Sequence, residues 1–169
     1  MEENMVLEGR AHVFGDHINT DYIIAAKHKS RLTDLDDMVE YIMEDIRPGF
    51  IKEIEPGDFI VAGVNFGCGS SRETAPWVIK KSGIAAVLAK GFARIFFRNS
   101  INIGLRVARV DTASIQEGDL LQVDLASGKV KNGTRGDMMP TQPMPPFIQS
   151  ILDAGGVKNY LKTHKTFDL

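Results

Sequence analysis

The chain has few of the residues that mark several common classes of protein. Its 169 residues include one cysteine and one tryptophan, and its formal net charge is −2. A single thiol cannot form an internal disulfide. A nearly neutral charge gives no electrostatic reason to bind nucleic acid or an anionic membrane. The composition therefore argues against a disulfide-stabilised protein, a nucleic-acid-binding protein and a membrane-surface protein.

Long apolar runs and targeting signals are missing as well. No apolar run approaches the ~18 residues of a membrane span. The acidic start Met1-Glu2-Glu3-Asn4 lacks the basic and apolar regions of a signal peptide. A length of 169 residues suits one domain with a sizeable core. We therefore expect a single cytoplasmic domain that covers residues 1–169.

Metal ligands at a recognisable spacing are also lacking. The four histidines show no ligand pattern along the sequence; they are His12, His17, His28 and His164. Cys68 has no histidine near it in sequence, and a lone cysteine is more often a small packed residue than a ligand or a nucleophile. We expect this chain to hold no metal and no cofactor by itself.

What the sequence does contain is an alternation of strand-like and helix-like segments. Strands are predicted at 10–14, 58–64, 84–89 and 105–110, and a hairpin at 120–125 and 129–131. Helices are predicted at 34–46, 74–82, 92–101 and 147–154, with a basic surface loop at 27–33 and an irregular segment at 132–146. This order predicts an α/β or α+β domain with a mixed sheet.

A glycine-rich run joins one predicted strand to the helix that follows it. The run reads Asn65-Phe66-Gly67-Cys68-Gly69-Ser70-Ser71-Arg72-Glu73. Backbone N–H groups at a helix N-terminus favour an anion in front of them. Ser70, Ser71 and Arg72 add two hydroxyls and a guanidinium that can grip both oxygens of a carboxylate. The run therefore predicts a carboxylate site.

A structural role fits part of the same run. Ser70 and Glu73 have the spacing of a capping box, in which a serine caps the helix and a glutamate reaches back. Pro76 supports an alternative, because proline is comfortable only in the first turn of a helix. In that alternative Ser70 to Arg72 form a tight turn and the regular helix begins near Pro76. A capped N-terminus can still bind an anion.

Three separated motifs resemble the small subunits of 3-isopropylmalate dehydratase, which form the swivel-domain part of the aconitase superfamily. The motifs are the run from Gly15 to Ile24, the run Asn65–Glu73 with Ala75-Pro76, and the run from Lys90 to Asn99. The tail from Pro145 to Val157 is also similar. The resemblance covers nearly the whole chain and is to the short form of the subunit. It implies an α/β fold, the swivelling β/β/α domain.

The resemblance also implies a reaction and a partner. Enzymes of this family isomerise 2-isopropylmalate and 3-isopropylmalate in leucine biosynthesis by removing and re-adding water. Their chemistry uses a [4Fe-4S] cluster, which needs several cysteine ligands, whereas this chain has only Cys68. The cluster would therefore lie on a separate large subunit. The isolated small subunit could also self-associate into a homo-oligomer.

Residue by residue, the resemblance assigns three roles in the glycine-rich run. Ser70 matches the catalytic base, Ser71 matches a contact to the substrate carboxylate, and Arg72 matches the carboxylate-binding arginine. A serine hydroxyl is a poor base unless its alkoxide is stabilised. The helix N-terminus and Arg72 could supply that stabilisation.

The chain departs from the family pattern after the first motif. Family members commonly read Ile-Ile-Pro-Ala-Arg-Tyr-Leu, whereas this chain continues from Ile23-Ile24 into Ala25-Ala26-Lys27-His28-Lys29-Ser30-Arg31. An isopropyl group disfavours a charge beside it, whereas a third carboxylate favours an arginine. Arg31 is therefore a candidate substrate contact, unless this loop is solvated and its charges point away. Homoaconitase, 2,3-dimethylmalate dehydratase and a non-catalytic carboxylate-binding module stay open as alternatives.

Overall fold

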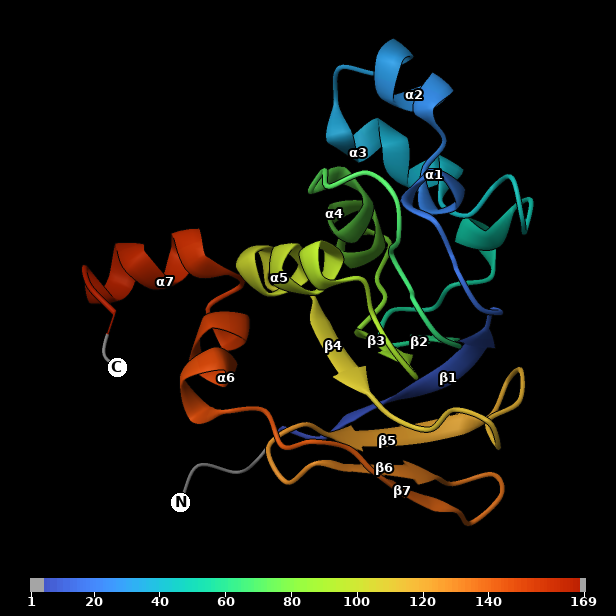
Figure 1. Cartoon of the computed structure of the whole chain (residues 1–169), viewed down its shortest axis with the longest axis vertical. Coiled ribbons are helices and arrows are strands. Elements are labelled where there is room, and N and C mark those ends of the chain that lie inside the picture. The colour runs from blue at the N-terminus through green and yellow to red at the C-terminus, as the bar shows by residue number, and fades with distance from the viewer. Residues whose placement is uncertain (1–4, 168–169) are drawn as a thin grey trace.

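The computed structural model describes residues 5–167, and its centre is one mixed sheet (Figure 1). The strand order is β4-β3-β2-β1-β5-β6-β7. The strands are β1 Leu7–Val13, β2 Phe59–Ala62, β3 Ala86–Ala89, β4 Arg106–Arg109, β5 Leu120–Asp124, β6 Lys129–Asn132 and β7 Met138–Pro140. β1 to β4 pair in parallel, whereas β5, β6 and β7 are antiparallel to their neighbours. The predicted mixed sheet is confirmed.

The sheet curls until its two edges meet. An antiparallel bridge joins Val110, which follows β4, to Thr141, which follows β7. The Thr141 hydroxyl also donates to the Arg109 carbonyl at 2.5 Å. These contacts cover the ends of both edge strands, which otherwise present unpaired backbone groups.

Side chains alternate between two apolar cores along the parallel strands. In β2, Ile60 and Ala62 pack against the helices, whereas Phe59 and Val61 face the inside of the curled sheet. All four residues are buried. Successive side chains of a strand point to opposite faces, so a strand buried on both faces reads as a continuous apolar run. This explains why residues 58–64 show no alternation.

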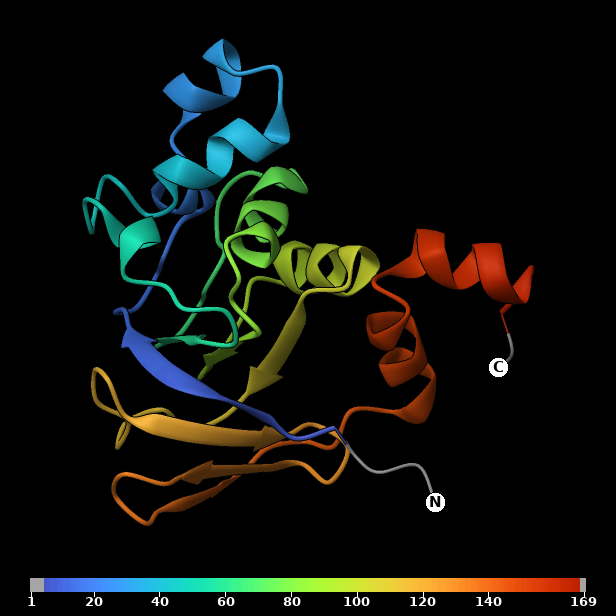
Figure 2. The same ribbon diagram turned by 180° about the vertical axis from the view of Figure 1, so that it is seen from behind.

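The helices gather on one side of the sheet (Figures 1 and 2). They are α1 Thr20–Ile23, α2 Ala26–Arg31, α3 Leu35–Met38, α4 Thr74–Lys81, α5 Arg94–Ile103, α6 Pro146–Asp153 and α7 Val157–His164, with short 3-10 turns η1 Val39–Tyr41 and η2 Phe50–Lys52. α5 packs against α4, α6 and α7. Among the helices described, none is long and apolar enough to cross a membrane.

The predicted helix at 34–46 is wrong in its length. Asp34 caps its start, because its side chain accepts from the Asp36 N–H at 2.9 Å. The α-helix ends at Met38, and Met43 has a left-handed backbone with φ 55°. The Met43 N–H donates to the Ile23 carbonyl at 2.9 Å instead of to the preceding helical turn. A tertiary hydrogen bond thus replaces the helical one.

Two further predictions from sequence are wrong. The basic segment expected as a loop is helix α2. The segment expected to be irregular contains β7, which pairs with β6. β7 has only three residues, too few for a pattern of alternation to emerge.

Candidate active site at the loop between β2 and α4

The glycine-rich run lies between two neighbouring loops that hold it by backbone hydrogen bonds. On one side, the Gly67 N–H donates to the Ile18 carbonyl at 2.8 Å, and the Thr20 N–H donates to the Cys68 carbonyl at 2.8 Å. On the other side, the Phe66 N–H donates to the Gly91 carbonyl at 2.9 Å. The three sequence motifs therefore meet at the carboxyl ends of parallel strands, where α/β sheets bind ligands.

Two glycines are required by this close packing. Gly67 has φ +80°, and a β-carbon there would overlap the side chain of Phe96 on α5. Gly69 has φ +105°, and a β-carbon there would lie 2.5 Å from Asn19 Oδ1. Both positions combine a left-handed backbone with a filled neighbourhood, so a larger residue would shift the segment that follows.

The backbone of Ser70 is fixed while its side chain stays free. The Ser70 N–H donates to Thr20 Oγ1 at 3.0 Å, and Thr20 itself is only 2% exposed. Ser70 is exposed, and its hydroxyl makes no hydrogen bond to the rest of residues 5–167. The buried contact to Thr20 therefore holds the Ser70 backbone in place, while the Ser70 hydroxyl is exposed to a ligand.

The next two residues extend the same exposed surface. The Ser71 carbonyl accepts from Asn99 Nδ2 on α5 at 2.8 Å. Arg72 is exposed, and within the described residues its guanidinium forms no ion pair. Sequence reasoning did not identify Asn99 as a positioning residue, although Asn99 is the last residue of the third motif. A free guanidinium beside free hydroxyls suits a carboxylate ligand.

The capping-box prediction is wrong. The alternative is confirmed for the start of the helix, which lies near Pro76, but it is wrong about the tight turn, because Ser70 to Arg72 form neither a turn nor a bend. α4 begins at Thr74, its N-cap residue is Glu73, and no side chain caps it. Ser70 to Arg72 precede the helix, and Pro76 lies in its first turn. No serine hydroxyl is taken up by the helix, and the uncapped N–H groups of its first turn favour a nearby anion.

Arg31 lies apart from this loop. It is the last residue of α2, which stands at the outer end of the helical side (Figure 1). In the part of the chain that the structure describes, no hydrogen bond or ion pair joins its side chain to another residue. The structure therefore brings Ser70, Ser71 and Arg72 together and leaves Arg31 on a separate element.

The other basic residues of α2 lie close to acids. Lys27 Nζ lies 3.8 Å from Asp45, and Lys29 Nζ lies 3.5 Å from Asp21. His28 Nε2 lies 3.0 Å from Glu44, and the His28 ring stacks on Tyr41 at a centroid distance of 3.9 Å. The run is thus locally neutralised except at Arg31, which leaves Arg31 as its one cation without a partner among residues 5–167.

Comparisons with known proteins identify the family of this chain. A family model described as the aconitase C-terminal domain matches residues 47–110. The chain is 48% identical over 160 residues to 3-isopropylmalate dehydratase small subunit 2 of Archaeoglobus fulgidus, covering 95% of this chain and 97% of that one. It is also 48% identical to the 3-isopropylmalate dehydratase small subunit of Wolinella succinogenes, covering 93% and 94%.

A solved structure has the same fold. The crystal structure of a 3-isopropylmalate dehydratase from Methanocaldococcus jannaschii superposes with a TM-score of 0.90 at 43% sequence identity. The match covers 95% of this chain and 96% of that chain. The similarity therefore extends over nearly the whole length of both chains.

Proposed function

Since this chain belongs to the family of 3-isopropylmalate dehydratase small subunits, we propose that it is the small subunit of a hydro-lyase that interconverts 2-isopropylmalate and 3-isopropylmalate in leucine biosynthesis. The observation that carries this proposal is the free Ser70 hydroxyl on a loop anchored by Thr20 and followed by the unpaired Arg72. An exposed nucleophilic oxygen beside a free guanidinium matches an acid–base site for a carboxylate substrate.

Ser70 is the base in this proposal. Its alkoxide takes the proton from the carbon next to a substrate carboxylate, and hydroxide leaves the adjacent carbon, so that a double bond forms. Hydroxide then adds to the carbon that lost the proton, and Ser70 returns its proton to the carbon that lost the hydroxide, which restores the alkoxide. The positive end of α4 and Arg72 stabilise the alkoxide, most strongly once water is excluded.

Ser71 and Arg72 hold the substrate carboxylate. Arg72 supplies two parallel N–H donors in a fixed plane, which a carboxylate accepts at both oxygens. The bond from Asn99 to the Ser71 carbonyl, 2.8 Å long, fixes the backbone between Ser70 and Arg72. The substrate is thereby oriented with its acidic carbon toward Ser70.

The rest of the active site lies on a partner in this proposal. Cys68 is the chain's one cysteine, so a [4Fe-4S] cluster needs ligands from a large subunit. Lewis acidity at the departing hydroxyl is what that cluster would supply. A large subunit closed over the exposed loop would also keep water out of the site.

Reconstitution tests this function directly. The chain is purified anaerobically with a large subunit carrying its cluster, and hydration of isopropylmaleate, cis-homoaconitate and dimethylmaleate is measured. Hydration of isopropylmaleate supports the proposal. A stable complex that hydrates one of the other two would mean a related hydro-lyase. No complex and no activity with an intact cluster would favour a non-catalytic carboxylate-binding module.

Arg72→Lys is expected to raise KM for isopropylmaleate roughly 10-fold or more while kcat changes less, because lysine keeps the charge and loses the two parallel hydrogen bonds. Steady-state kinetics of the reconstituted complex measure both constants. Arg98→Lys is the matched control, since Arg98 is also exposed and forms no ion pair among the described residues. An unchanged KM in the Arg72 variant would assign Arg72 to structure alone.

A second candidate, a homoaconitase-like activity, is favoured by one observation: Arg31 is the cation of α2 that has no ion-pair partner among the described residues 5–167. If Arg31 binds a third carboxylate, Arg31→Ala raises KM for cis-homoaconitate roughly 10-fold or more and leaves isopropylmaleate unaffected. Lys29→Ala is the control, because Lys29 is already paired with Asp21. Equal, small effects of both variants on every substrate would place Arg31 outside the site.

A further inference from the structure

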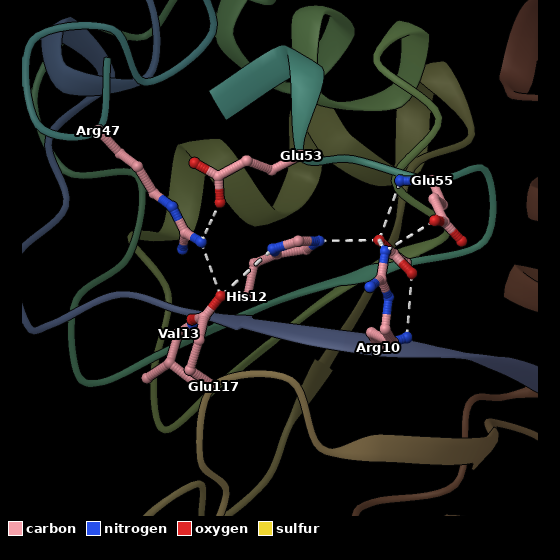
Figure 3. Close-up of polar contacts among 8 residues, drawn as sticks. Arg10, His12, Val13, Arg47, Glu53, Glu55 and Glu117 are labelled. Carbon is pink, nitrogen blue, oxygen red and sulfur yellow. Dashed lines mark hydrogen bonds and ion pairs between the residues drawn. The ribbon is translucent and has the colours of Figure 1, made fainter. Parts of the chain in front are cut away.

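A second cluster of charged side chains lies at the end of β1, away from the Ser70 loop. Figure 3 shows His12 of β1 between two groups of charged residues. Glu55 and Arg10 lie on one side of it, and Glu53, Glu117 and Arg47 lie on the other. The ligand atoms of His12, Glu53 and Glu117 all lie within 4.8 Å of one another. The proposed hydro-lyase reaction uses none of these residues.

Asp58 determines which nitrogen of His12 carries the proton. Asp58 Oδ2 lies 2.8 Å from His12 Nε2 and also accepts the Glu55 N–H at 3.0 Å, and Asp58 Oδ1 accepts the Arg10 N–H at 3.0 Å. Two backbone N–H groups donate to the Asp58 carboxylate, so Asp58 is the acceptor of these contacts and His12 Nε2 is placed to donate to it.

The other ring nitrogen of His12 is left without a partner. His12 is 5% exposed, and its Nδ1 forms no hydrogen bond within residues 5–167. The ring edge-packs on Phe50 with centroids 5.1 Å apart. In the neutral imidazole Nδ1 is a bare lone pair, and a buried polar atom without a partner is costly. Its nearest acidic atom is Glu117 Oε1 at 3.5 Å, which also has only lone pairs to offer.

Glu117 is held beside β1 with one of its oxygens directed at His12 Nδ1. Its Oε2 accepts the Val13 N–H at 2.7 Å, which fixes the carboxylate beside β1. Its Oε1 points toward the Nδ1 of His12 and accepts from Arg47 at 2.7 Å (Figure 3). Glu53 adds a second carboxylate that is also hydrogen-bonded to Arg47. Both glutamates are exposed, so the cluster is open to an ion from solvent.

The geometry points to a site for a zinc-like divalent cation, bound by His12 Nδ1, Glu53 and Glu117. An imidazole nitrogen with two carboxylates is a donor set that zinc accepts, with water completing four ligands. The Asp58–His12 hydrogen bond is the support that metal-bound histidines receive on their second nitrogen. The cation would cross-link β1 to the segments before β2 and β5, and so act as a structural clip.

Arg47 competes with a cation for the carboxylates of Glu53 and Glu117. Its guanidinium supplies the positive charge that now lies between Glu53 and Glu117. It also lies over the rings of Phe14 and Phe50, at 5.6 and 5.1 Å from their centroids, so it keeps favourable contacts when an ion takes the carboxylates. The alternative way to satisfy Nδ1 is a second proton on His12, which would make an imidazolium facing Glu117.

Zinc titration of the full-length chain distinguishes a bound cation from a second proton on His12. After treatment with a chelator, we expect one zinc ion per chain by competition with a chromophoric chelator, and a higher Tm with zinc than without. Glu53→Gln and Glu117→Gln should each weaken binding by at least about 10–100-fold, the range for losing even a supporting contact. Glu55→Gln is the control, because Glu55 is an exposed acid of the same cluster that lies outside the ligand set.

Arg47 and His12 give two further tests of the zinc site. Arg47→Gln should tighten zinc binding, because it removes the charge that opposes the ion. Nitrogen-15 NMR should show one protonated nitrogen on His12 and a shift of Nδ1 when zinc is added. Two protonated nitrogens with no zinc binding, or zinc binding equally strong in the Glu53, Glu117 and Glu55 variants, would overturn the site.

Discussion

Ser70→Ala is expected to lower kcat of the reconstituted enzyme at least ~10²-fold, the low end of what a general base contributes. The physical reason is that alanine removes the oxygen that takes the substrate proton and leaves the loop intact. Ser70 is exposed, and the contact that anchors it uses its backbone N–H rather than its hydroxyl. The variant should therefore fold, bind the large subunit and bind substrate.

The control for Ser70→Ala lies two residues earlier in the same loop. Cys68→Ala removes a half-buried thiol of similar size, whereas the backbone contacts of Cys68 to Thr20 persist. We expect kcat of this variant to stay within several-fold of the unmodified complex. Near-normal turnover of Ser70→Ala would remove Ser70 from the role of base. An equal loss in both variants would mean that the loop is merely sensitive to substitution.

The second large effect is expected on stability, from Gly67→Ala. The β-carbon would overlap the Phe96 side chain at a position with φ +80°. A left-handed backbone costs a non-glycine residue roughly 1–2 kcal/mol, and overpacking adds roughly 1–3 kcal/mol. Because the shifted loop carries Ser70, kcat should fall as well. Urea unfolding gives the free energy, and the isopropylmaleate assay gives kcat.

A variant of a second glycine separates the cost of a left-handed backbone from the cost of overpacking. Gly136 has φ +82°, nearly that of Gly67, but no atom lies within 4 Å of where its β-carbon would be. Gly136→Ala should therefore lose only the backbone part, roughly 1–2 kcal/mol, and keep its activity. Equal losses of unfolding free energy in the two variants would mean that Phe96 moves aside freely, and that contact with α5 does not hold the loop.

The position of the candidate site followed from local chemistry. A glycine-rich turn after an apolar run, with serines and an arginine before a helix, predicts an anion site from the residues alone. The resemblance of three motifs added the enzyme family and the roles of Ser70, Ser71 and Arg72. Comparisons confirm the family, and the roles await the variants described above.

The elements that sequence reasoning missed depend on distant contacts. The helix predicted at 34–46 stops early because the Met43 N–H bonds to the Ile23 carbonyl. β7 is a strand because it pairs with β6, and a bridge between Val110 and Thr141 joins the residue after β4 to the residue after β7. Neither partner is visible in a local pattern of hydrophobicity, since such patterns report which face is buried and not which backbone group bonds to which.

The sequence by itself predicted a mixed α/β domain, its buried strands and a candidate carboxylate site at the glycine-rich loop, because periodicity and turn residues act over a few neighbouring positions. Only the tertiary structure decided that Thr20 anchors Ser70, that Arg31 alone among the cations of α2 has no ion-pair partner within the part of the chain described, and that His12 lies near Glu53 and Glu117. These contacts join residues far apart in the chain. Their side chains meet only because the curled sheet brings the ends of its strands together.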